Sequence, residues 1–241
     1  MREFVKRDST PGLLDADARG LDWLRVPGGP PLPRVVAVSG DELRLEWIEP
    51  GRASATAAAD FGRRLAVMHG SIEESRYGAD ADGFIGPLPL DNTWHDDWPS
   101  FYAESRLAPY LQGLDPDTGR AVEDVIAHLP ELAGPAEAPA RIHGDLWSGN
   151  VLWATDGRVW LIDAGSAHVG HRETDLAMMA LFGAPHLDEI IRAYDESAPL
   201  SPRWRDRVSL HQLHPLLVHA QLFGGNYVRQ VRAAARHASA Q

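Results

Sequence analysis

The chain has 241 residues, 44% of them hydrophobic, which is enough to bury a sizeable core as one domain or two small lobes. Its formal net charge of −11 disfavours binding to the phosphates of nucleic acids. The arginines over 229–236 fit a solvated helix end better than a surface that binds nucleic acid. The absence of cysteine excludes disulfides and cysteine–zinc sites, and no stretch approaches the roughly 18 apolar residues of a membrane span. We therefore expect a cytoplasmic protein with neither a nucleic-acid nor a membrane partner.

The first fifty residues predict a small unit rich in strands. Its expected elements, in chain order, are a strand over 3–6, a helix over 14–25, strands over 34–38 and 42–47, and a hinge at 49–51. Beyond the hinge the pattern is mainly helical. The expected helices cover residues 53–69, 98–111, 115–129, 176–182, 187–196 and 203–236.

These elements predict an α+β fold with two lobes. Residues 1–50 would form an N-terminal lobe that binds nucleotide, and residues 51–241 a larger helical lobe that holds the catalytic residues and the acceptor. Nucleotide would bind in the crevice between the lobes.

Two aspartates and an asparagine have the spacing of a phosphoryl-transfer site. Asp145 and Asn150 are five positions apart, and Asp163 lies 18 positions beyond Asp145. The intervening Asp156-Gly157 predicts a hairpin, which brings Asn150 and Asp163 to neighbouring ends of two paired strands. One aspartate can accept a hydroxyl proton, while the asparagine and the second aspartate supply oxygen ligands for magnesium. The alternative is that these residues only cap a helix and begin a turn.

Lys6 is the single lysine of a chain that otherwise uses arginine. A lysine on a strand can neutralise phosphate charge, and an acid on the following helix can hold its flexible stem. We expect Asp17 to be this acid, with Asp15 as the alternative. An ordinary surface lysine is the other interpretation of Lys6.

Two aromatic groups admit two interpretations each. Trp98, with Trp94, could line the acceptor pocket or pack in the core at a helix start. A second group, His211, His214 and His219, has the residue type of a zinc site, but packed or exposed histidines on a helix explain its spacing better.

Longer motifs resemble the fructosamine kinase family, a branch of the aminoglycoside phosphotransferase-like kinases. The matching segments are Ile142-His-Gly-Asp-Leu-Trp-Ser-Gly-Asn-Val151, His171-Arg-Glu-Thr-Asp-Leu-Ala-Met178, Asn92-Thr-Trp-His-Asp-Asp-Trp98 and Leu222-Phe-Gly-Gly-Asn-Tyr227. The resemblance implies a protein-kinase-like fold and transfer of the ATP γ-phosphate, with Mg²⁺, to the sugar 3-hydroxyl of a ketoamine. The acceptor would be a small ketoamine or a glycated lysine of a protein, so the reaction would serve protein deglycation.

The resemblance also assigns roles to residues. Asp145 would be the catalytic base, Asn150 and Asp163 the magnesium ligands, and Lys6 with its partner Asp17 the phosphate-binding pair. Backbone groups of Glu46 and Ile48 would meet the adenine, and Trp147 would form a wall against the sugar-amine. Asp175 would organise the catalytic loop as a helix cap, or else contact the substrate.

The chain departs from the family pattern in two places. Ala164-Gly165 replaces the usual Pro-Ala after the second aspartate, which should loosen that turn. Only five residues precede Lys6, too few for the glycine-rich hairpin that covers ATP phosphates, so the N-terminal lobe is truncated and the edge of the lysine strand is expected to be unpaired. We expect that residues upstream of Met1 complete the hairpin. Two other functions compete with that of a ketoamine kinase. One is a catalytically impaired nucleotide-binding pseudoenzyme, and the other is a kinase of aminoglycosides or amino alcohols.

Overall fold

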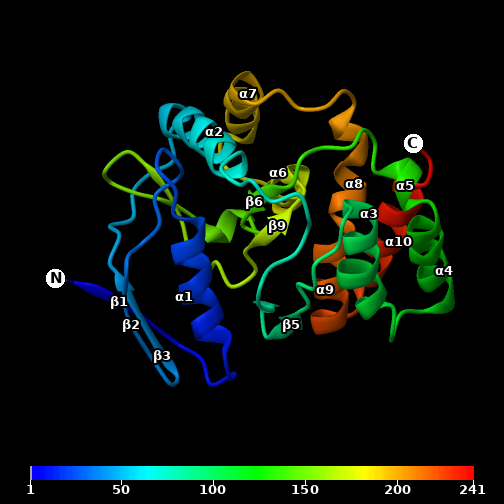
Figure 1. Ribbon diagram of the computed structural model, residues 1–241, viewed down its shortest axis with the longest axis horizontal. Coiled ribbons are helices and arrows are strands. Elements are labelled where there is room, and N and C mark those ends of the chain that lie inside the picture. The colour runs from blue at the N-terminus through cyan, green and yellow to red at the C-terminus, as the bar shows by residue number, and fades with distance from the viewer. Residues whose placement is uncertain (1) are drawn as a thin grey trace.

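The computed structural model describes residues 2–241, and its N-terminal part is an antiparallel sheet backed by one helix (Figure 1). The sheet has the strand order β1-β3-β2 and consists of β1 (Glu3–Arg7), β2 (Val35–Ser39) and β3 (Glu42–Glu46). Lys6 on β1 is in register with Leu43 on β3. Because β1 pairs only with β3 among the described strands, it forms an edge of the sheet, as the sequence predicts.

Helix α1 (Leu13–Leu24) packs between this sheet and the rest of the molecule. Leu14, Leu21 and Leu24 are buried, at the helical spacing that the sequence shows. The same helix buries the polar side chain of Asp17, which faces Lys6.

The remaining chain is mainly helical, with three short two-stranded sheets. The strand pairs are β4 (Gly83–Ile85) with β5 (Leu88–Leu90), β6 (Ala140–Ile142) with β9 (His168–Gly170), and β7 (Val151–Trp153) with β8 (Val159–Leu161). The larger helices are α2 (Ala55–His69), α4 (Pro116–Ala127), α6 (Arg172–Phe182), α7 (Leu187–Ser197), α9 (Leu213–Phe223) and α10 (Asn226–Ala238), and the one-turn helices are α3 (Trp98–Phe101), α5 (Leu129–Leu132) and α8 (Val208–His211).

Two apolar cores hold these elements together, and they do not divide at residue 50. The first core joins α1 and β3 to α2, β8, α6 and α7, with Phe61, Leu161 and Tyr194 among its buried members. The second joins the π-helical segment Tyr102–Leu107 to α4, α9 and α10. The sheet of the N-terminal lobe therefore shares its core with the segment that carries Asp145 and Asp163. No helix in residues 2–241 is both long and apolar enough to cross a membrane.

The sequence-based helices are largely confirmed, with two corrections. Residues 98–111 are helical but composite, since α3 continues into the π-helix and a 3₁₀ turn at Ala108–Tyr110. Residues 203–236 are not one helix. Gly224 and Gly225 adopt positive φ values of 60° and 57°, which ends α9 and redirects the chain into α10. The start of α4 is as predicted, because Asp115 accepts hydrogen bonds from the amides of Asp117 and Thr118.

A glycine on α1 sets how closely this helix approaches the turn that follows Asp163. A Cβ atom added at Gly20 would lie 1.9 Å from the carbonyl oxygen of Ala164, directly after Asp163. We predict that Gly20→Ala lowers the free energy of unfolding by about 1–3 kcal/mol, because α1 must move away from this turn. Urea unfolding curves will measure the change. Gly119→Ala on α4 is the matched control: nothing lies within 4 Å of the added atom, so it should be neutral or stabilising. Equal effects of both substitutions would contradict the close-approach argument.

Candidate active site

The loop that carries Asp145 follows β6 and is fixed by contacts of the His143 side chain with backbone groups. The imidazole of His143 joins Ile162 to Asp145, because its Nε2 lies 2.9 Å from the Ile162 carbonyl oxygen and its Nδ1 accepts from the Asp145 amide at 3.3 Å. These contacts require the neutral imidazole with its proton on Nε2. His143 thus links the loop of Asp145 to the strand end that carries Asp163, a role that its place in the His-Gly-Asp motif could have suggested.

Asp145 and Asn150 lie side by side at this loop, as the spacing predicts. The amide nitrogen of Asn150 donates to the Asp145 carboxylate at 3.0 Å and to its backbone carbonyl at 2.8 Å. The amide oxygen of Asn150 therefore remains available as a ligand. Burial raises the pKa of Asp145 to about 6, although the hydrogen bond from the Asn150 side chain partly counteracts that shift. The carboxylate is still mainly ionised at neutral pH and able to accept a proton.

Lys6, Asp17 and Asp163 meet opposite this pair. Lys6 Nζ donates to Asp17 at 2.9 Å and also contacts the Asp163 carboxylate. The other oxygen of Asp17 accepts from the Ala164 amide at 2.8 Å, so Asp17 holds both the lysine and the turn after Asp163. Asp15 is exposed, which confirms Asp17 as the partner. Burial would lower the pKa of Lys6, but the charges of Asp17 and Asp163 outweigh burial and raise it.

One cavity of about 220 Å³ joins these residues. It is lined by Lys6, Leu13, Asp17, Phe84, Gly86, Asp145, Trp147, Asn150, Asp163, Gly165 and Ser166. Asn150 and Asp163 present hard oxygen donors to the same space, which fits the preference of Mg²⁺. The turn of Asp163 is held from both sides, since Phe84 donates to the Gly165 carbonyl at 3.0 Å while Asp17 holds Ala164.

Trp147 lines this cavity, and its expected contact with the sugar-amine stays a prediction. Its indole is 39% exposed and lies over Gly149, where an added Cβ would come within 2.3 Å of the ring. The Trp-Ser-Gly sequence therefore has a steric reason, because only glycine lets the indole lie this close to the 3₁₀ turn Ser148–Asn150.

The two residues expected at the adenine lie at the end of β3 and just beyond it. Glu46 already donates its backbone amide to Arg34 at 2.9 Å. Ile48 is half-buried, and its amide has no hydrogen-bond partner within residues 2–241. The adjacent hinge is tied to the β7–β8 hairpin, because Gly51 donates to the Trp153 carbonyl at 2.7 Å. The adenine contact itself stays a prediction.

Trp98 lies apart from this cavity. It is 4% exposed and packs against Tyr102 and His211, with ring centroids 4.7 Å away in each case, and against His171 at 5.0 Å. It borders a separate cavity of about 770 Å³ that does not include Asp145. The geometry favours the packing interpretation of Trp98, and its role toward the acceptor stays a prediction.

The histidines considered for zinc do not come together. His219 packs against Phe182, Phe223 and Tyr227, away from His211. His211 instead neighbours His171 and Glu173. Both carboxylate oxygens of Glu173 already accept from Arg207, at 2.9 and 2.6 Å, so this group is a buried ion pair with histidines around it.

Asp175 organises the catalytic loop, although not as a helix cap. Its fully buried carboxylate accepts from the amides of His143 at 2.8 Å and Gly144 at 3.0 Å. The cap of α6 is His171, whose Nδ1 accepts from the Glu173 amide, and Asp175 sits one turn further into the helix. The ring nitrogen of His171 therefore caps the helix in place of the carboxylate that the sequence predicted.

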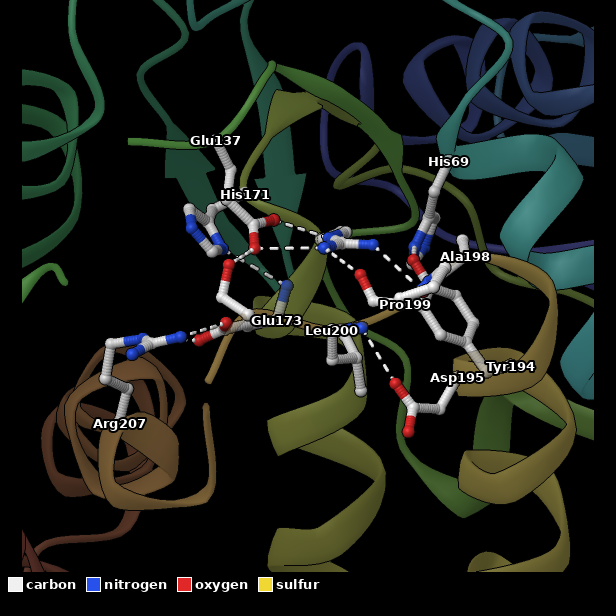
Figure 2. A network of polar contacts seen from close by, with 12 residues as sticks. His69, Glu137, His171, Glu173, Tyr194, Asp195, Ala198, Pro199, Leu200 and Arg207 are labelled. Carbon is white, nitrogen blue, oxygen red and sulfur yellow. Dashed lines mark hydrogen bonds and ion pairs between the residues drawn. The ribbon is translucent and has the colours of Figure 1, made fainter. Parts of the chain in front are cut away.

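A buried polar network supports Asp175, and Figure 2 shows two of its members, His69 and Tyr194. His69 at the end of α2 contacts Asp175 at 3.2 Å through Nε2 and the Tyr194 hydroxyl at 2.8 Å through Nδ1. The pKa of Asp175 is lowered because these contacts and the loop amides outweigh the effect of burial. His69 and Tyr194 are 125 positions apart, and nothing local in the sequence pointed to them.

Comparisons with known proteins identify the family of the chain. The model of the family described as fructosamine kinase matches residues 4–240. "Probable ketoamine kinase YniA" of Escherichia coli is 32% identical over 93% of this chain and 81% of its own, and a "Probable ketoamine kinase" of Thermus thermophilus is 36% identical over 92% and 81%. The crystal structure of a "putative fructosamine-3-kinase" from Thermobifida fusca superposes with a TM-score of 0.93 at 49% identity, covering 99% of this chain and 86% of that one.

More distant structures define the fold. Choline kinase LicA from Streptococcus pneumoniae matches with a TM-score of 0.67 at 16% identity, over 99% of this chain and 86% of that one. The aminoglycoside phosphotransferase APH(4)-Ia matches with a TM-score of 0.65 at 17% identity, over 99% and 88%. The fold is thus that of the protein-kinase-like phosphotransferases. Within this class, the chain belongs to the fructosamine kinase family.

The Glu173–Arg207 pair gives a pH-dependent prediction. Burial would raise the pKa of Glu173, but His211 and Arg207 outweigh it and lower the pKa to about 2 from 4.5. A carboxyl group whose pKa is lower in the folded than in the unfolded protein stabilises the fold at pH values above its unfolded-state pKa. This stabilisation is lost as the pH falls toward the folded-state pKa. We predict that the difference in unfolding free energy between wild type and Glu173→Gln shrinks by about 3 kcal/mol as the pH falls from about 5 to 2.

Urea unfolding at a series of pH values measures this difference. Glu131→Gln, which changes an exposed glutamate, is the matched control and should show no such trend. A pH-independent difference for Glu173→Gln would show that the ion pair does not set the pKa of Glu173.

Proposed function

We propose that the protein phosphorylates the sugar 3-hydroxyl of ketoamines with ATP and Mg²⁺, and so serves deglycation of small ketoamines or of glycated lysines in proteins. The observation that supports this most is the shared cavity, which places the ionisable Asp145 carboxylate beside Asn150 and opposite the Lys6–Asp17 pair and Asp163. The family supports a ketoamine acceptor, because similar proteins are named probable ketoamine kinases.

Each residue has a chemical task in this proposal. Asp145 accepts the proton of the acceptor hydroxyl. At the same time the hydroxyl oxygen bonds to the γ-phosphorus of ATP, and the bond from that phosphorus to the leaving ADP breaks. Lys6, held by Asp17, neutralises phosphate charge. Asn150 and Asp163 would hold magnesium, which when bound neutralises charge on the phosphate oxygens. Ile48 would meet the adenine through its backbone amide, and Trp147 would confine the sugar over Asp145.

We predict that Asp145→Asn lowers kcat by about 10²–10⁴-fold, because the amide cannot accept the hydroxyl proton. The measurement is ADP release from Mg-ATP with ribuloselysine and fructoselysine as acceptors. Asp15→Asn makes the same chemical change on an exposed face of α1 and should retain wild-type turnover.

A substrate panel separates the competing functions. Wild-type turnover in Asp145→Asn would refute the role of Asp145. Release of ADP with kanamycin or choline but not with ketoamines would favour a related small-molecule kinase. Binding of Mg-ATP with no ADP release for any acceptor would favour a nucleotide-binding pseudoenzyme.

A further inference from the structure

Five aromatic side chains form a continuous row that begins at the catalytic cavity. The ring centroids of Trp147 and Phe182 are 5.9 Å apart, and those of Phe182 and His219 are 5.1 Å apart. His219 continues the row to Phe223 at 5.7 Å and to Tyr227 at 4.9 Å. We call these five residues the aromatic strip.

The strip is exposed to an extent that core packing does not explain. Phe223 is 67% exposed, and Phe182 and Trp147 are 38% and 39% exposed. Elsewhere in residues 2–241, the large apolar side chains with comparable exposure lie on the small sheet or on α2; they are Phe4, Val5, Val38 and Val67. Connected exposed apolar surface of this kind marks a binding site rather than a folding requirement.

The strip borders the cavity on two sides. Trp147 belongs to both, because it lines the cavity beside Asp145 and contacts Phe182. Gly86 is also a lining residue, and a methyl group of Leu222 on α9 lies 3.8 Å from where a Cβ atom of Gly86 would be. The end of α9 that presents Phe223 is therefore next to the cavity rim.

The charges at this end of the strip favour a cation. Asp17, Asp145 and Asp163 line the cavity with Lys6 as the one basic residue among its lining groups, so carboxylates are in excess. Aromatic faces attract cations within about 6 Å of the ring centroid, with a strength that rises as water is excluded. A ligand with a cationic centre near Trp147 and an apolar arm beyond it would match both features.

We propose that the aromatic strip is the subsite for the amine-side arm of the acceptor, and that Phe223 with Tyr227 sets which amine substituents are accepted. The inference rests on the proposed function: a ketoamine carries its basic nitrogen on C1, two carbons from the reacting C3 hydroxyl. With that hydroxyl at Asp145, the ammonium lies against Trp147 and the alkyl arm follows Phe182 and His219. The arm reaches solvent at Phe223, the most exposed ring of the strip, so a lysine side chain of a peptide can occupy it.

The test compares two acceptors that differ only in the arm. Wild type, Phe223→Ala, Phe223→Trp and the control Val67→Ala are assayed for ADP release with ribuloselysine and with 1-amino-1-deoxyribulose, whose nitrogen carries no substituent. Phe223→Ala should raise KM for ribuloselysine about 3- to 30-fold, while kcat, KM for ATP and KM for 1-amino-1-deoxyribulose stay within about twofold of wild type. Phe223→Trp should restore the low KM, and Val67→Ala, which trims an exposed side chain on α2, should behave as wild type.

Equal changes for the two acceptors, or no change for either, would overturn the subsite while leaving the kinase assignment intact. Concentration-dependent self-association of the wild type that Phe223→Ala abolishes, with KM unchanged, would assign the strip to an interface between copies. If the wild type phosphorylates neither acceptor, the proposed function fails. In that case, calorimetric titration measures the binding of ribuloselysine to wild type and to Phe223→Ala. Equal affinities would overturn the proposed subsite.

Discussion

The geometry of the site depends on one buried carboxylate, that of Asp17. A carboxylate with 1% exposure is costly unless charged and hydrogen-bonding partners surround it. Its partners here are the Lys6 ammonium and the Ala164 amide, which come from a strand and from a turn far along the chain. Satisfying Asp17 therefore brings β1, α1 and the turn of Asp163 into contact, and the close approach at Gly20 makes that contact possible.

The catalytic loop follows the same physical principle. Asp175 is buried beside the cavity rather than in it, and its oxygens hold the amides of His143 and Gly144 that precede Asp145. His69 supports Asp175 in turn, and Tyr194 supports His69. A buried aspartate thus fixes the backbone beside each of the two candidate acids: Asp175 holds the amides that precede Asp145, and Asp17 holds the amide that follows Asp163. Fixing the backbone lowers the reorganisation needed when charge moves between reacting atoms.

The parts of the site that were predictable are those that local chemistry determines. Asp145 and Asn150 are joined by a single turn, and Asp156-Gly157 sets the hairpin that returns the chain to Asp163. The partner of Lys6 was predictable because a strand and the next helix leave few acids within reach. The resemblance to the family added the roles, while the residues alone indicated the chemistry.

Other features depend on packing that the sequence does not encode locally. An indole such as that of Trp98 suits a core as well as a binding wall, and its contacts with Tyr102 and His211 arise from distant helices. His171 caps α6, because the carboxylate of Asp175 is already hydrogen-bonded to the amides of the loop before Asp145. The extent of the aromatic strip likewise depends on how α9 and α10 meet after the glycine pair.

The contrast between the buried acids and the aromatic strip bears on how acceptor choice can change. Removing a buried carboxylate leaves an ammonium or backbone amides without partners, so the loss spreads through the loop that holds Asp145. An exposed ring such as Phe223 holds no buried polar group, and exchanging it changes only the exposed surface of the aromatic strip. In the proposed function, the phosphoryl-transfer chemistry is therefore constrained by the interior, while the amine side of the acceptor can be selected at the exposed strip.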